Sequence, residues 1–264
     1  TGFRQYRLFI KDLASGSIQG PLAERVTSVT WASDGRTVLY VTEDPVTKRS
    51  DTLWRLVPGS PAVKVHEEKD ALFNIGIGRT KDRKLLELAI RSTDTWEARI
   101  LEAERPGGAF RAVLPREKGH KYDIDHRDGL LYIRTNKGAK NFRMVTAPLA
   151  DPSPRNWTSF LEHRSDVLLE GVELFKDFGV VTEKAAGLRR LRVLEFASGK
   201  WRDIAFPEPV YMAYGAGTPE YDTRQFRYGY QSMVTPSSIY AYDMERGDSV
   251  LLKRQAVLGG YDPA

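Results

Sequence analysis

The stretch SVTWASDGRTVLYVTED, residues 28–44, shows the structural unit from which this chain is built. It contains a short run of β-branched and aromatic residues, the turn sequence Ser33-Asp34-Gly35, and a longer run of the same kind. Runs of this composition bounded by Asp-Gly turns predict β-strands joined by tight hairpins. Two further runs, TLWRLVPG and AVKVHEE, follow directly, so the unit contains four predicted strands.

The same plan recurs along the chain. Its copies begin near Val26, Leu72, Lys121, Val167 and Val210. Four strands at a period of about 43 to 49 residues are typical of the blades of a β-propeller. A single four-stranded sheet has two apolar faces that it cannot cover alone, and blades therefore stack face to face. The tyrosine-rich stretch YGYQSMVTPSSIYAYDM, residues 228–244, belongs to the fifth copy and is structural.

The segment QYRLFIKDLASGSIQGP, residues 5–21, resembles only the two outer strands of a blade. We therefore predict an all-β fold, a β-propeller with half a blade followed by five complete blades.

The composition of the chain argues against nucleic-acid binding and against membrane association. The chain has 264 residues, of which 41% are hydrophobic and 28% charged, and a net charge of +5. Lys and Arg are interspersed with Asp and Glu, and no basic block interleaved with aromatics indicates nucleic-acid binding. No apolar run approaches the roughly 20 residues of a membrane-spanning helix, so we expect no membrane association. The absence of cysteine excludes disulfides and thiolate metal ligands, and it fits a cytoplasmic protein.

We identify no catalytic residue, metal site or cofactor site in the sequence. The segment GSIQG, residues 16–20, has its serine one place too early for a nucleophile elbow and lies between two predicted strands. The segment GIGRT, residues 76–80, lacks the helix that follows a phosphate-binding loop. His120 and His126 are too far apart for regular zinc ligands, and we expect surface or turn positions for both. Acidic residues flank the turns, where carboxylates accept local backbone hydrogen bonds.

Several motifs in sequence order resemble the propeller region of the oligopeptidase B group (also called protease II) in the prolyl oligopeptidase family of serine peptidases. They are TGFRQYRLFIKDLASG, HKYDIDHRDGLLYIRTN, AKNFRMVTAP, VLLEGVELF, FRYGYQSMVTPSSIYAYDM and VLGGYDPA. The resemblance implies a seven-bladed propeller that caps an α/β-hydrolase domain bearing a Ser-Asp-His triad. It also implies that the propeller restricts access to short peptides, which the group cleaves after Lys or Arg.

The resemblance divides the chain into a partial propeller domain, residues 1–257, and a linker, residues 258–264, to a missing α/β-hydrolase catalytic domain. It implies two partners, this catalytic domain of the same parent chain and short basic peptides. No catalytic residue can be carried over, because no matching position lies in this chain. We therefore expect a domain that gates substrates for a reaction performed elsewhere.

The connections between blades and the loops between second and third strands are expected to share the face that meets the catalytic domain. Segments such as HEEKDA, STDTW and PREKGHK make this face highly charged. The charges would contact the catalytic domain or steer cationic peptides by their field. The candidate residues are Arg25, Glu43, Asp44, Glu67, Glu68, Glu117, Lys140 and Arg164.

Two alternatives remain open. A free-standing propeller that binds proteins or ligands should contain whole blades at both ends, whereas this chain begins within a blade. An enzyme with its site inside the propeller would need clustered carboxylates on inner strands, and only YDIDH and GVELF place acids there.

Overall fold

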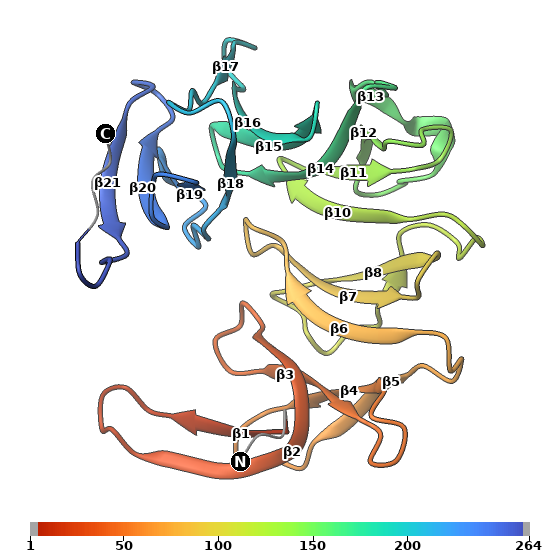
Figure 1. Ribbon diagram of the computed structural model, residues 1–264. Coiled ribbons are helices and arrows are strands. Elements are labelled where there is room, and N and C mark those ends of the chain that lie inside the picture. The colour runs from red at the N-terminus through yellow and green to blue at the C-terminus, as the bar shows by residue number, and fades with distance from the viewer. Residues whose placement is uncertain (1–4, 261–264) are drawn as a thin grey trace. The chain divides into compact units, whose positions relative to one another are not determined.

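The computed structural model describes residues 5–260, and in this range the chain consists of β-strands and one short 3-10 helix, η1 (Pro154–Asn156) (Figure 1). The strands form five antiparallel sheets in which each strand pairs with its neighbours in the sequence. The prediction of an all-β fold of short meandering sheets is confirmed. The sheets fall into two compact units, of which unit 1 ends at Ile124 and unit 2 begins at Asp125.

Unit 1 contains two sheets. The first comprises β1 (Tyr6–Lys11), β2 (Ile18–Trp31), β3 (Val38–Glu43), β4 (Ser50–Leu56) and β5 (Val63–Glu67). The second comprises β6 (Asn74–Arg79), β7 (Leu85–Arg91), β8 (Trp96–Glu102) and β9 (Arg111–Ala112).

Three sheets follow, and they form unit 2. The first comprises β10 (Tyr122–Arg127), whose first residues close unit 1, β11 (Leu130–Thr135), β12 (Arg143–Pro148) and β13 (Thr158–Leu161). The second comprises β14 (Val167–Leu174), β15 (Phe178–Ala185), β16 (Leu188–Glu195) and β17 (Trp201–Asp203). The third comprises β18 (Tyr211–Gly215), β19 (Gln225–Ser232), β20 (Ser238–Asp243) and β21 (Ser249–Arg254).

The first sheet has five strands because the predicted half blade runs into the first whole blade without a break. The first half of β2 pairs with β1, and its second half, from Val26 onward, pairs with β3. The backbone bends between these halves at Arg25, which has a positive φ of 56° and lies within a register shift between β1 and β2. Such a bulge increases local bending and twist, and Figure 1 shows β2 turning sharply along its length.

The hairpin turns are held by acidic side chains, as the sequence predicted. Asp34 accepts hydrogen bonds from the backbone N–H groups of Arg36 and Thr37, at 3.0 and 2.9 Å. Asp44 and Asp243 accept equivalent pairs of backbone hydrogen bonds in their own turns. These carboxylates serve the local backbone, as expected of aspartate at the first position of a turn.

Each unit has its own hydrophobic clusters between consecutive sheets. In unit 1, β-strand alternation points Leu39, Val41 and Leu53 toward Leu86 and Leu88, and all five side chains are fully buried. In unit 2, an aromatic cluster that includes Phe226, Tyr228 and Tyr242 fills the space between the last two sheets. Burying a large apolar side chain stabilises the fold by roughly 1.5–3 kcal/mol. The sheets are therefore stacked through their faces, as the blade interpretation requires.

Arginines reinforce this stacking within each unit. In unit 1, Arg55 of β4 donates to the carbonyl of Pro106 in the next sheet, at 2.9 Å. In unit 2, Arg127 donates to the carbonyl of Lys176 at 2.9 Å, and its guanidinium carbon lies 3.9 Å from the centre of the Phe196 ring. The planar guanidinium can bond a carbonyl and stack on a ring at the same time.

The expectation of surface or turn positions is wrong for His126, which is on a strand, whereas His120 directly follows a turn but is not at the surface. His120 and His126 are both buried, and His120 lies 5.0 Å from the Tyr122 ring between centroids. His126 is on strand β10, where alternation places it on the same buried face as Tyr122 and Ile124. Because one face of β10 is covered, strand alternation buries each residue on that face, including a polar one such as His126.

The proposed domain limits, residues 1–257 and 258–264, remain predictions. Strand β21 ends at Arg254, and residues 261–264 of the expected linker lie outside the described residues.

Candidate functional site

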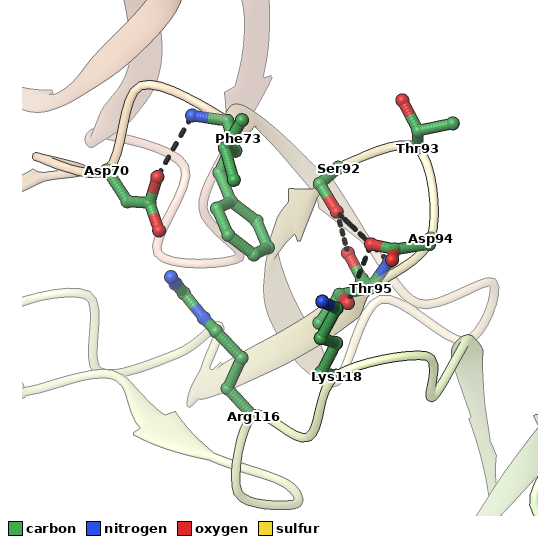
Figure 2. Close-up of a pocket in the computed structure, with 9 residues that line it drawn as sticks. Asp70, Phe73, Ser92, Thr93, Asp94, Thr95, Arg116 and Lys118 are labelled. Atoms are coloured by element: carbon green, nitrogen blue, oxygen red, sulfur yellow. Dashed lines mark hydrogen bonds between the residues drawn. The ribbon is translucent and has the colours of Figure 1, made fainter.

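Unit 1 has a pocket of about 600 Å³ at one end of its strands (Figure 2). Three connections meet around it: residues 68–73 between β5 and β6, residues 92–95 between β7 and β8, and residues 113–121 between β9 and β10. Its walls are formed by Asp70, Leu72, Phe73, Ser92, Thr93, Asp94, Thr95, Arg116 and Lys118. We call it the Arg116 pocket.

Arg116 reaches from the last of these connections into a buried pair of carboxylates. Its Nη2 donates to Glu68 Oε2 at 2.6 Å, and its Nε donates to Glu97 Oε2 at 2.7 Å. Glu97 also accepts a hydrogen bond from Arg99, at 2.6 Å. The guanidinium carbon of Arg116 lies 4.0 Å from the centre of the Phe73 ring. The buried charges are thus paired by short, charge-assisted hydrogen bonds.

Burial and pairing oppose each other in setting the pKa values of this network. Burial alone would raise the pKa of Glu68, but hydrogen bonds from Arg116 and from the Asp70 N–H outweigh it and lower that pKa. Burial disfavours the charged form of Arg116, yet the bonds to both carboxylates raise its pKa. Nearby His66 has a lowered pKa, chiefly because of burial and secondly because of the Arg99 charge. These shifts favour the ionised form of Glu68 beside the neutral form of His66.

A second arginine fixes the connection between β5 and β6. Arg49 Nη1 donates to the carbonyls of Glu68, Asp70 and Phe73, at 2.9, 3.3 and 3.0 Å. Asp70 Oδ1 in turn accepts the N–H of Leu72 at 3.0 Å. These bonds occupy backbone groups that a loop would otherwise leave to water, so the connection has a defined conformation.

The opposite wall is a polar turn. Ser92 and Thr95 donate their hydroxyl hydrogens to Asp94 Oδ1, at 3.1 and 2.9 Å, and these bonds lower the pKa of Asp94, that from Thr95 most. Thr95 also accepts the N–H of Gly119, at 3.1 Å. None of the residues that line the pocket is a histidine, so the pocket lacks the serine–histidine pair of a serine hydrolase.

Unit 2 has a smaller pocket, of about 100 Å³, around a related ion pair. Arg164, from the connection between β13 and β14, donates to the buried carboxylate of Glu183. Arg192 approaches the same oxygen at 3.4 Å. Each unit therefore pins an arginine from a connection between sheets onto a buried glutamate. Among the described residues, no group of three or more His, Asp or Glu side chains is arranged to hold a metal ion.

Comparison with known families identifies these sheets. Residues 1–255 match the family model described as the N-terminal β-propeller domain of prolyl oligopeptidase. The chain belongs to the prolyl oligopeptidase family. Its sheets are blades of the family's propeller, and the β-propeller prediction is confirmed.

Two curated relatives of this propeller align over nearly the whole chain. Dipeptidyl aminopeptidase BI of Pseudoxanthomonas mexicana is 39% identical over 99% of the chain and 36% of its own length. Protease 2 of Moraxella lacunata is 28% identical over 99% of the chain and 38% of its own length. The chain thus spans little more than a third of either relative.

Solved oligopeptidase B structures have the same fold as this propeller. The structure from Leishmania major superposes with a TM-score of 0.85 at 27% identity, over 96% of this chain and 37% of that one. The closed form from Trypanosoma brucei, with covalently bound antipain, superposes with a TM-score of 0.82 at 28% identity. The match covers 89% of this chain and 35% of that one. The resemblance to oligopeptidase B that the sequence suggested is confirmed, and in such relatives the propeller is joined to a catalytic hydrolase domain in the same chain.

Within this propeller, most of the predicted site residues are engaged in local contacts. Glu68 binds Arg116, and Arg164 binds Glu183. Arg25 and Glu43 pair with each other at 3.4 Å across the bend in β2.

Of the other four predicted residues, Glu67 ends strand β5, and Asp44, Glu117 and Lys140 lie in turns and connections. Asp44 caps its own turn, and Glu67 forms an exposed pair with Lys64 at 2.7 Å, which lowers the pKa of Glu67. Glu117 and Lys140 are exposed, and the carbonyl of Glu117 accepts the N–H of His120. Their roles in gating or interdomain contact remain predictions.

Sequence reasoning found the three loops around the pocket but selected only charged side chains from them. It missed Leu72 and Phe73, which form the apolar wall, and Arg116, which is the centre of the ion-pair network. The sequence contained one usable signal, since Leu72-Phe73 is an apolar pair inside an otherwise charged connection. The partners of Arg116 lie 48 and 19 residues away, and no local pattern indicates them.

Proposed function

We propose that this propeller gates substrates for a cytoplasmic serine peptidase that hydrolyses short peptides after Lys or Arg. The observation that carries the proposal is the alignment with Protease 2 over 99% of the chain, together with the superposition on oligopeptidase B structures. The partners in this proposal are the α/β-hydrolase domain of the same parent chain and short basic peptides. The chemistry belongs to that domain.

The packing of the sheets supports a gating role. Within each unit, consecutive blades are joined by buried apolar clusters and by arginines that bridge one sheet to the next. A domain held in this way forms a stiff wall, because close-packed interiors deform little. Such a wall over a hydrolase site would exclude folded proteins and admit flexible short peptides.

The ion pairs favour a filter based on size over one based on charge. Glu43, Glu67 and Glu68 each have a basic partner within 3.4 Å, which cancels much of the field that a cationic peptide would feel. We therefore propose that preference for Lys or Arg arises in the hydrolase domain. The propeller would set the length of peptide that enters.

A second activity is favoured by a specific observation. The relative named dipeptidyl aminopeptidase is 39% identical to this chain, compared with 28% for Protease 2. A dipeptidyl aminopeptidase releases dipeptides from a free amino end, so the parent of this propeller would then need an unblocked substrate. A free-standing binding propeller has less support, because both relatives carry the matched region within a chain nearly three times as long.

The experiment compares arylamide substrates of the full-length parent. An amino-blocked substrate ending in Arg-Arg tests cleavage after a basic residue inside a peptide, and a free dipeptide arylamide tests release from an amino end. Blocked Ala and Glu substrates are the specificity controls. The proposal predicts preferential hydrolysis of the blocked Arg substrate. Hydrolysis of free dipeptide substrates alone would establish the second activity, and equal rates on Arg, Ala and Glu would contradict the proposed specificity.

A further inference from the structure

Leu72 is an exposed apolar side chain in the wall of the Arg116 pocket, with 74% of its surface accessible. It lies directly before the buried Phe73, at the tip of the connection between β5 and β6. We propose that Leu72 is an apolar anchor by which the propeller binds the α/β-hydrolase domain of its own parent chain. The inference deepens the proposed function and rests on it, because it names the residue and the chemistry of the contact between the two domains.

The first argument is the rigidity of the connection that carries Leu72. The Leu72 N–H is bound by Asp70 Oδ1 at 3.0 Å, and the Phe73 N–H by the Asp70 carbonyl at 3.1 Å. Arg49 binds three carbonyls of the same connection, and Glu68 Oε1 accepts the Asp70 N–H at 2.9 Å. Because the backbone of this connection is already ordered, binding at Leu72 would cost little backbone conformational entropy.

The second argument is the arrangement of polar groups around this side chain. Arg116 is already bound to Glu68 and Glu97, and Asp94 already accepts the hydroxyls of Ser92 and Thr95. Their strongest hydrogen-bonding capacity is used inside the domain. Leu72 and Phe73 are the apolar residues of the pocket wall, and they lie beside polar residues such as Arg116, Asp94 and Lys118 (Figure 2). An apolar contact next to a polar rim is common in protein–protein interfaces.

The third argument concerns the occupant. The relatives place the matched propeller in chains of which it is little more than a third, and those chains also hold a hydrolase domain. The connections after β5, β7 and β9 lie at one end of the strands, so a single globular partner can contact all three. A peptide substrate of variable sequence would gain no consistent contact from one fixed aliphatic side chain. A covalently attached domain presents the same surface to Leu72 in every molecule.

Photocrosslinking in the full-length parent tests the contact directly and needs no activity. Leu72→p-benzoylphenylalanine places the probe at the anchor. Leu13→p-benzoylphenylalanine is the matched control, because Leu13 is 90% exposed in the β1–β2 turn, on the opposite side of unit 1 in Figure 1. The proposal predicts a crosslink from position 72 to a peptide of the hydrolase domain and none from position 13. A crosslink from position 72 only to added substrate peptide, to a second copy of the chain, or to nothing would overturn it.

A functional readout uses Leu72→Asp and the control Leu13→Asp in the same full-length protein. Loss of an interface anchor should weaken closure of the two domains, and we expect the preference for a short peptide over a 40-residue peptide, in kcat/KM, to fall roughly fivefold or more. Leu13→Asp should keep the wild-type preference. If Leu72→Asp matches wild type while peptides are still hydrolysed, the anchor is refuted but the gating proposal survives. If the wild type itself shows no preference for short peptides, the gating proposal fails, and the crosslink alone decides the contact.

Discussion

Removal of the Arg116 charge should be one of the most damaging single changes in unit 1. Arg116→Met keeps an unbranched stem against Phe73 but leaves Glu68 and Glu97 without their shared cation. Only 8% and 4% of the two glutamate side chains are exposed. Taking one partner from a buried ion pair costs about 3–5 kcal/mol. Arg99 still binds Glu97 and Arg116 is itself partly exposed, so we expect about 2–4 kcal/mol of lost stability at neutral pH.

The pH dependence of this loss has a defined sign. Because the pKa of folded Glu68 lies below its ordinary value of 4.5, its ionised form stabilises the wild type above that pH, and this contribution disappears as pH falls through the folded pKa. The difference in free energy of unfolding between wild type and Arg116→Met should therefore be largest at pH 7, and it should decrease below pH 4.5. Adding Glu68→Gln to the variant should recover part of the loss at pH 7, because one uncompensated buried charge is removed.

The assay is urea denaturation followed by tryptophan fluorescence and circular dichroism, at pH 7 and at pH 4. Arg155→Met is the matched control, because Arg155 pairs with Asp151 on the surface, and its midpoint should stay near that of wild type. If Arg116→Met has wild-type stability at pH 7, or if the stability difference increases on acidification, the Arg116 ion pairs do not stabilise unit 1 as proposed.

Two further changes test packing, the first between paired strands of one sheet and the second between two sheets. In Gly229→Ala, the new Cβ would lie 2.3 Å from the Tyr214 ring, so we expect a loss of about 1–3 kcal/mol by urea denaturation. Gly78→Ala, with open space at its Cβ, should unfold within about 1 kcal/mol of wild type, and equal losses for both would contradict the steric argument. Tyr122→Phe leaves the N–H groups of Ala98 and Leu114 without their acceptor and should cost about 1–3 kcal/mol. Because burial raises the pKa of Tyr122 to about 12, its stabilisation should be lost as pH rises from 10 through that value, and ultraviolet titration of the variant should lack one late-ionising tyrosine. A titration identical to that of wild type would count against this assignment.

The period of the blades could be read from the sequence because it depends on local signals. The predicted copies begin at Val167, Val210 and Lys121, and the corresponding strands begin at Val167, Tyr211 and Tyr122. Turn residues and alternating apolar residues act over a few positions, so they are visible in one sequence. Some outer strands were harder to predict, because they are too short for an alternating pattern: β9 has two residues and β17 three.

The site depends on contacts that no local pattern reports. Glu68 was selected for its charge, but its partner Arg116 is 48 residues away, and only the stacking of two sheets brings them together. Arg25 was selected for the same reason, whereas the structure places it at a bend in β2 with a positive φ. His126 was expected at a surface or turn position because its spacing from His120 does not suit zinc ligands, whereas strand alternation buries it on β10. The charge of a residue indicates that it can face water. Tertiary packing decides which charged side chains form ion pairs within the domain and which remain available to contact a partner.

We propose that this propeller shapes a reaction whose nucleophile lies in another part of the parent chain. An active-site-directed fluorophosphonate, followed by mass spectrometry of the labelled full-length protein, measures this directly. We predict one labelled serine in the hydrolase domain and none among residues 1–264. Stoichiometric labelling of a serine within these residues, or hydrolysis of a peptide arylamide by the 264-residue chain alone, would contradict it.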